Sequence, residues 1–343
     1  MANSKKQKTP LIFVKRSKPI VSEVFDTYWK FAVKRQEAFF SRIEGRDKPW
    51  SEDAIISQYK FTNAFRASDR VSQYLIKNVI YSKKWSLKDT VFRILLFKIF
   101  NKIDTWQLLE ENFGEISTKT FNLNEFDAVL EKQIASKKSI YSAAYIMPSG
   151  PKKKYLGVRK HKFHLTLLSD LLKDDFHQLL KDQSSMEAGF DLLLSIESFG
   201  RFLAYQFIID LNYSDWFNFS ENDFVVPGPG ALDGIRKCFT DLGDYTPVDI
   251  IKMMTDDQEY HFDRLSYDFK NLWGRSLHLI DCQNLFCEVD KYSRIAHPDV
   301  QGISGRTRIK QKFNPTPSYL NVWYPPKWRI NENIVISQEY QSM

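Results

Sequence analysis

The sequence has few cysteines and no long apolar run. Its three cysteines, Cys238, Cys282 and Cys287, cannot form a disulfide framework and lack the spacing of a four-cysteine zinc or iron–sulfur site. No stretch of eighteen apolar residues occurs, and the N-terminus has no apolar signal core. We therefore predict a cytoplasmic protein without a membrane-spanning segment. We expect no metal site and no cofactor.

Strand-like alternation is also scarce, and apolar residues such as Leu168, Leu172 and Leu179 recur at helical spacing. With 343 residues, 43% of them apolar and 15% aromatic, the chain is long enough to bury a large core. We predict a mainly α protein of two helical lobes over residues 21–330, with a basic arm at 1–20 and a tail at 331–343. A proline- and aromatic-rich stretch at 314–328 predicts an extended strap.

The formal net charge of +7 is concentrated in three basic clusters. Basic clusters attract nucleic acid because binding releases counterions, although each cluster alone could equally be a solvated tail or loop. Three clusters in one chain favour nucleic acid as the partner. They comprise Lys5, Lys6, Lys8, Lys15, Arg16 and Lys18; then Lys152, Lys153, Lys154, Arg159, Lys160 and Lys162; and finally Arg306, Arg308, Lys310 and Lys312.

The stretch IESFGRFLA at 196–204 has the order of a helix–hairpin–helix motif: an apolar residue, a turn with Gly200, and a small residue. Such a turn lets backbone N–H groups at a helix N-terminus meet a phosphate. Ser198 stands where the first glycine of the pattern usually lies, so a helix kinked at glycine is the alternative. We expect Gly200 and Arg201 to bind DNA, together with an exposed basic loop or hairpin at 151–164.

A second glycine-rich stretch, VVPGPGALDGI, occupies residues 225–235. Its two glycines and two prolines predict a rigid turn with few side chains, which a flipped base or a phosphate could approach closely. Glycosylases with a helix–hairpin–helix carry a catalytic aspartate after a similar apolar segment, and here PGPGA at 227–231 replaces it. Phe202 stands where lyase-competent members carry a lysine, so we expect no Schiff-base chemistry.

Two predicted helices have a polar face beside an apolar one, each within about 100° of arc. Such a face is either a solvated surface or the wall of a polar cleft. In the helix predicted over 61–74, the alternative is an internal salt bridge of Arg66 or Arg70 with Asp69. In DCQNLFCEVDKY the polar residues are Asp281, Asn284, Glu288, Lys291 and Tyr292; in FTNAFRASDRVSQY they are Asn63, Arg66, Arg70 and Gln73, with Asp69 at the edge.

FTNAFRASDRV, FGRFLAYQFIIDL, VVPGPGALDGI and DCQNLFCEVDKY resemble signatures of the α-glutamyl/putrescinyl thymine pyrophosphorylase family, over about residues 22–325. That family resembles an offshoot of the helix–hairpin–helix DNA glycosylases, and it is similar to anti-phage glycosylases that excise glucosylated 5-hydroxymethylcytosine. The resemblance implies that the protein binds double-stranded DNA containing modified pyrimidines. We expect the protein to be a monomer. It places the site at Asn63, Arg66, Asp69, Gly228, Gly230, Asp281, Gln283, Asn284, Glu288 and Lys291.

From this resemblance we predict a monofunctional DNA glycosylase that flips and excises a modified pyrimidine in anti-phage defence. Asp281 is the favoured catalytic acid because it opens its helix after the apolar run LHLI, and Glu288 would position water or the base. Asp233 stands where the family usually has a basic residue, and a carboxylate there would stabilise an oxocarbenium-like sugar. The alternatives are a transferase that replaces pyrophosphate on a 5-hydroxymethyl pyrimidine with an amine, and a DNA-binding module without catalysis.

Overall fold

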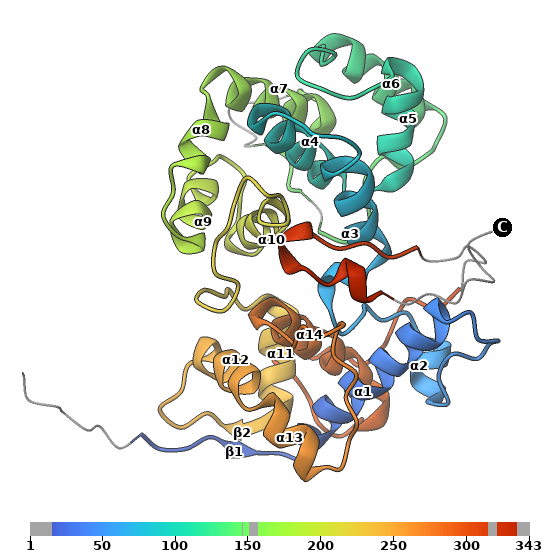
Figure 1. Ribbon diagram of the computed structural model, residues 1–343, viewed down its shortest axis with the longest axis vertical. Helices are drawn as coiled ribbons and strands as arrows, with labels where there is room; N and C mark the ends of the chain where they lie inside the picture. The colour runs from blue at the N-terminus through green and yellow to red at the C-terminus, as the bar shows by residue number, and fades with distance from the viewer. Residues whose placement is uncertain (1–15, 146, 151–156, 315–320, 335–343) are drawn as a thin grey trace, which may run out of the picture.

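The computed structural model describes residues 16–145, 147–150, 157–314 and 321–334, and these residues are mainly helical, as predicted (Figure 1). Two short strands, β1 (Ile20–Val21) and β2 (Phe239–Asp241), pair antiparallel. The helices are α1 (Val24–Ile43), α2 (Ala54–Gln58), α3 (Arg70–Tyr74), α4 (Leu87–Phe100), α5 (Ile103–Phe113), α6 (Leu123–Ala135), α7 (Lys160–Lys173), α8 (Phe176–Lys181), α9 (Met186–Leu194), α10 (Arg201–Leu211), α11 (Pro229–Cys238), α12 (Pro247–Asp256), α13 (Gln258–Arg264) and α14 (Leu279–Ala296).

The helices lie in two groups, with α4–α10 in one and α1, α2 and α11–α14 in the other (Figure 1). In the second group α1 packs against α11 and α14, so segments from the beginning and the end of the described chain build one core. The Tyr28 hydroxyl, for example, donates to the Cys282 carbonyl oxygen at 3.2 Å. No helix in the described ranges is long and apolar enough to span a membrane.

Helices α11 and α14 approach each other closely because α11 carries a glycine at the crossing. A Cβ atom at Gly234 would lie 2.0 Å from the Phe286 carbonyl oxygen, so only glycine fits there. At its other end α11 begins with Gly228 as N-cap and Pro229 as the first helical residue. The stretch predicted as a rigid turn is therefore a helix start followed by a helix–helix contact.

Helices α9 and α10 flank a turn at residues 195–200, where the helix–hairpin–helix motif is predicted. Ser198 has a φ of 73°, the left-handed conformation that glycine adopts most easily, which matches its place at the position where glycine is usual. Gly200 itself has an ordinary φ of −85° and forms the N-cap of α10. The turn thus exists, and its role in DNA binding remains a prediction.

Two predicted elements are wrong in their extent. The basic loop expected up to residue 164 ends earlier, because α7 begins at Lys160 and buries His164 and Leu168, four residues apart on one face. The helix expected over 61–74 is replaced by an extended segment, a 3-10 turn at Arg66–Ser68 and the short α3. Side-chain carboxylates accept the backbone N–H groups of this segment, which competes with helix formation.

Residues 315–320 of the predicted strap lie outside the described residues; residues 321–325 have no regular secondary structure, and two 3-10 turns follow, η3 (Pro326–Trp328) and η4 (Asn331–Asn333). The Tyr324 hydroxyl lies 2.8 Å from Ser68 Oγ, and the Trp323 N–H donates to Gln73 Oε1 at 2.7 Å. Lys327 donates to the Phe217 carbonyl oxygen at 2.7 Å, just beyond α10. The strap therefore lies between the two groups of helices and contacts both (Figure 1).

Candidate nucleic-acid interface

A buried polar seam forms where the segment around Arg66 meets α4 and α10. The Arg66 guanidinium donates to Asp210 Oδ1 at 2.6 Å, to the Tyr213 hydroxyl at 2.8 Å and to Gln206 Oε1 at 3.0 Å. Lys98 Nζ lies 2.8 Å from Asp210 Oδ2. Burial lowers the pKa of Lys98 to about 8, although Asp210 opposes that shift. The internal salt bridge considered for Arg66 is therefore present, with Asp210 as the partner in place of Asp69.

Asp281, the favoured catalytic acid, joins this seam to the start of α14. Its Oδ1 accepts the Arg66 N–H at 2.8 Å, and its Oδ2 accepts the His278 N–H at 3.1 Å. The side chain is 4% exposed, and burial raises its pKa to about 6. The carboxylate of Asp281 therefore links the start of α14 to the Arg66 segment, which is more than 200 residues earlier in the chain.

The polar face of α14 is buried against residues 62 and 63, and is not a solvated surface. Glu288 Oε2 accepts the Thr62 N–H at 3.1 Å and pairs with Lys291 Nζ at 2.5 Å. Asn284 Nδ2 donates to Thr62 Oγ1 at 2.8 Å. The structure thus brings three of the residues implied by the family resemblance, Asn284, Glu288 and Lys291, onto the segment that carries Asn63.

Asn63 and Asp69 lie together at the end of this face. The Asn63 N–H donates to Asp69 Oδ1 at 2.8 Å, and Asn63 Nδ2 donates to the Ser68 carbonyl oxygen at 2.7 Å. Burial raises the pKa of Asp69 to about 6, while Arg35 on α1 acts in the opposite direction. Arg70, the next residue, is exposed.

The glycines of the 227–231 turn face packed side chains. A Cβ atom at Gly228 would lie 2.7 Å from the Phe202 ring, and one at Gly230 would lie 3.2 Å from Cys287 Sγ. Gln283 Nε2 is 3.1 Å from the same sulfur. A substrate role for Gly228, Gly230 and Gln283 therefore remains a prediction, while their packing role is evident.

Asp233 is the third predicted acid, and it holds a loop. Its Oδ1 accepts the Ser304 N–H at 2.8 Å, and the side chain packs against Gly302. Asp281 and Glu288 bind the segment around Arg66 and Thr62 instead. The three predicted acids thus do not form one cluster of interacting carboxylates.

The described residues predicted to bind DNA lie at the starts of two helices, α7 and α10. Lys152, Lys153 and Lys154 lie outside the described residues, as do the lysines at 5, 6, 8 and 15. Arg159 pairs with Asp127 at 2.6 Å and with Glu131 at 2.9 Å, beside the first residue of α7, Lys160. Arg201 is exposed at the start of α10.

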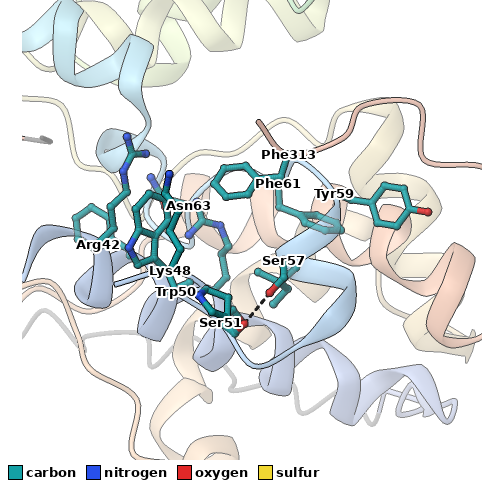
Figure 2. A pocket seen from close by; sticks show the side chains of 14 residues that line it. Arg42, Lys48, Trp50, Ser51, Ser57, Tyr59, Phe61, Asn63 and Phe313 are labelled. Atoms are coloured by element: carbon teal, nitrogen blue, oxygen red, sulfur yellow. Dashed lines mark hydrogen bonds between the residues drawn. The ribbon is translucent and has the colours of Figure 1, made fainter. Parts of the chain in front are cut away.

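A pocket of about 340 Å³ opens along α1, next to Asn63 (Figure 2). Helix α1 contributes residues at positions i, i+3, i+4 and i+7, which lie on one helix face. The extended segment 59–63 contributes every second residue, because alternate side chains of an extended chain point the same way. We call this the α1 pocket; its lining consists of Arg35, Ala38, Phe39, Arg42, Lys48, Pro49, Trp50, Ser51, Ile56, Ser57, Tyr59, Phe61, Asn63 and Phe313.

The lining of the α1 pocket is cationic and aromatic. Among the described residues that form it there are three cations and no carboxylate. The Trp50 indole has Arg42 at 5.1 Å and Lys48 at 5.3 Å from the ring centroid, and Figure 2 shows the three side chains side by side. The Trp50 N–H donates to the Arg46 carbonyl oxygen at 2.8 Å, which fixes the orientation of the ring.

The third basic cluster leads directly to this pocket. Residues 306–312, which we call the basic segment, expose all four of their cationic side chains. Lys312 forms an antiparallel bridge with Tyr59, and the Lys60 N–H donates to the Gln311 carbonyl oxygen at 3.0 Å. Phe313, which follows Lys312, lines the pocket. The basic segment therefore ends at the edge of the pocket.

Sequence reasoning did not identify the α1 pocket, apart from Asn63. Arg35, Ala38, Phe39 and Arg42 have the spacing of one helix face, so their grouping could be read from the sequence. Trp50 reaches the pocket through a loop, and no periodicity predicts that placement.

Comparison with known proteins assigns the family. Residues 22–302 match the family described as 5-hmdU DNA kinase, helical domain. The chain belongs to this family. It is similar to the 5-hmdU DNA kinase of Bacillus phage SP10, with 26% identity over 292 residues, and the match covers 78% of this chain and 45% of that protein. The chain thus spans less than half the length of this relative. No solved structure matches.

The family assignment corrects the predicted activity. A DNA glycosylase is a hydrolase, whereas the family is named for a kinase, so the prediction of base excision is wrong. The alternative, replacement of pyrophosphate by an amine, also differs from the reaction for which the family is named. The base in the family name is of the uracil type, whereas hydroxymethylcytosine was predicted. The coarser prediction, a family that acts on modified thymine in DNA, is confirmed. The link to helix–hairpin–helix glycosylases remains a prediction.

Proposed function

We propose that this chain acts on DNA that contains 5-hydroxymethyluracil and takes part in phosphorylation of the hydroxymethyl group. The observation that carries the proposal is the α1 pocket, whose aromatic and cationic lining is continuous with the basic segment. Polyphosphate backbones bind cations, and bases stack on aromatic rings. The name of the family supplies the identity of the base.

The proposed reaction is phosphoryl transfer from a nucleoside triphosphate. The hydroxymethyl oxygen attacks the terminal phosphorus, the new O–P bond forms, and the bond to the departing nucleoside diphosphate breaks while the hydroxyl proton leaves. Such a transfer depends mainly on positioning of the attacking oxygen and on charge stabilisation. We place this chain on the acceptor side of the reaction, where it binds the DNA and presents the modified base.

The proposal is tested with three duplexes of one sequence that carry 5-hydroxymethyluracil, thymine or 5-hydroxymethylcytosine at one position. Fluorescence anisotropy of the purified chain should give the tightest binding for 5-hydroxymethyluracil. Transfer of a labelled γ-phosphate to the same duplex, followed by nuclease digestion, would report the reaction itself. Equal affinity for all three duplexes, without label transfer, would contradict the proposal.

A further inference from the structure

We infer that the α1 pocket is the subsite for one nucleotide turned out of the DNA stack, and that it selects a base of the uracil type. This inference rests on the proposed function and names where the base is bound. A base inside a duplex is stacked and paired, so an enzyme that modifies it commonly extrudes it into a pocket.

The size and the walls of the pocket fit one nucleotide. Its volume of about 340 Å³ lies at the lower end of small-molecule sites, too small for several stacked bases. The pocket offers flat aromatic surface from Trp50 and Phe61, on which a base can stack. Arg42 and Lys48 lie over the Trp50 ring, at 5.1 and 5.3 Å from its centroid, so a base that replaces one of them on the indole would have its phosphate near cations.

The polar groups of the lining indicate which base edge is bound. Asn63 Nδ2 donates to the Ser68 carbonyl oxygen at 2.7 Å, and this bond turns the amide oxygen away from Ser68. An amide oxygen accepts a hydrogen bond, which matches the N3–H of uracil, whereas N3 of neutral cytosine carries no hydrogen. Arg35 lines the same pocket and can donate to a base carbonyl oxygen.

Two carboxylates outside the lining support Arg35. Asp69 and Glu288 both interact electrostatically with its guanidinium, which opposes the effect of burial. Burial lowers the pKa of Arg35 to about 10, so the side chain stays cationic at neutral pH. Asp69 also accepts the Asn63 N–H, so the same carboxylate supports both groups that would bind the base edge.

The test is calorimetric titration of the full chain with 5-hydroxymethyl-2′-deoxyuridine 5′-monophosphate and with the corresponding cytidine nucleotide. We expect the uridine form to bind at least several-fold more tightly. Trp50→Ala should weaken that binding by about tenfold, because a base loses its stacking partner. Trp216→Ala is the matched control, since Trp216 is 37% exposed beyond α10 and does not line the pocket.

A second pair of variants tests the phosphate. Lys48→Gln should weaken binding of the nucleotide but not of the nucleoside without phosphate, and Lys84→Gln, an exposed lysine before α4, should change neither. Lys48 is exposed, so its replacement leaves folding intact, as a thermal melt would verify.

The outcomes separate the two proposals. Equal nucleotide affinity in the folded Trp50→Ala and Trp216→Ala variants, or equal affinity for the uridine and cytidine nucleotides, would overturn the assignment of the pocket. If the chain still preferred duplex DNA with 5-hydroxymethyluracil, the proposed function would stand and the base would bind elsewhere. If the wild-type chain showed no preference for duplex DNA with 5-hydroxymethyluracil, the proposed function itself would be contradicted.

Discussion

The polar seam and the α1 pocket both contain arginine beside aromatic rings, yet their charges are arranged differently. In the seam, Arg66 and Lys98 share the Asp210 carboxylate, and all three side chains are almost fully buried. In the pocket, Arg35, Arg42 and Lys48 line an open space whose described lining has no carboxylate. The two buried cations of the seam share the Asp210 carboxylate, whereas in the pocket Asp69 and Glu288 act on Arg35 from outside the lining, and Arg42 and Lys48 lie over the Trp50 ring.

This difference separates structural from functional polar residues better than residue type does. Burying a charge is costly unless an opposite charge and hydrogen bonds compensate for it, so a compensated cluster stabilises one arrangement of its segments. A cation-lined space with aromatic walls gains its compensation from an anionic, planar ligand.

Replacing the counter-charge of the seam should have the largest effect. Asp210→Leu leaves Arg66 and Lys98 buried without their carboxylate, and we expect the free energy of unfolding to fall by about 3–5 kcal/mol. Urea denaturation followed by circular dichroism would measure this. Lys98→Met keeps the Arg66–Asp210 pair and should cost less. A loss below about 1 kcal/mol for Asp210→Leu would show that the seam does not stabilise the fold.

The pH dependence of stability should distinguish the buried acids. The pKa of Asp281 is raised to about 6, so its protonation contributes stability that is present below the unfolded pKa and is lost as pH rises through 6. The wild type should therefore gain roughly 2 kcal/mol over Asp281→Asn between pH 7 and pH 4. Urea unfolding at several pH values would measure the difference.

Asp233→Asn is the control for this series, because the hydrogen bonds from residues 303 and 304 and the charge of Arg306 outweigh desolvation and lower the pKa of Asp233. Its contribution is present above the unfolded pKa and lost as pH falls through the folded pKa, so the trend should have the opposite sign. The same sign for both variants would refute the contrast between these two carboxylates.

The smallest effect concerns the rim of the α1 pocket. Lys48→Gln should change the free energy of unfolding by less than about 0.5 kcal/mol and reduce the slope of log affinity against log salt, for duplex DNA, by about one. Lys84→Gln should leave that slope unchanged. Identical slopes for the two variants, measured by anisotropy from low to physiological salt, would place Lys48 away from the phosphates.

The sequence predicted the helical fold, the turn between α9 and α10, and α14, because each has strong local periodicity or turn chemistry. It failed over residues 61–69, where Glu288 and Asp69 accept the N–H groups of Thr62 and Asn63, and Asp281 accepts the Arg66 N–H, which in a helix would bond to the Thr62 carbonyl oxygen. Two of these three carboxylates are more than 200 residues away in the chain. The predicted site residues Asp69, Asp281 and Glu288 do contact one short segment, but their contacts depend on tertiary partners that no local pattern reveals.

The packing of α1 against α14 has a consequence for the order in which this protein can fold. The hydrogen bond from Tyr28 to Cys282 spans 254 positions, and β1 pairs with residues about 220 positions further on. On the ribosome, the apolar face of α1 must wait until most of the chain has been synthesised before its partner appears. Contacts of such high sequence separation form slowly and leave apolar surface exposed in the meantime. The group of α4–α10, by contrast, can assemble while translation continues.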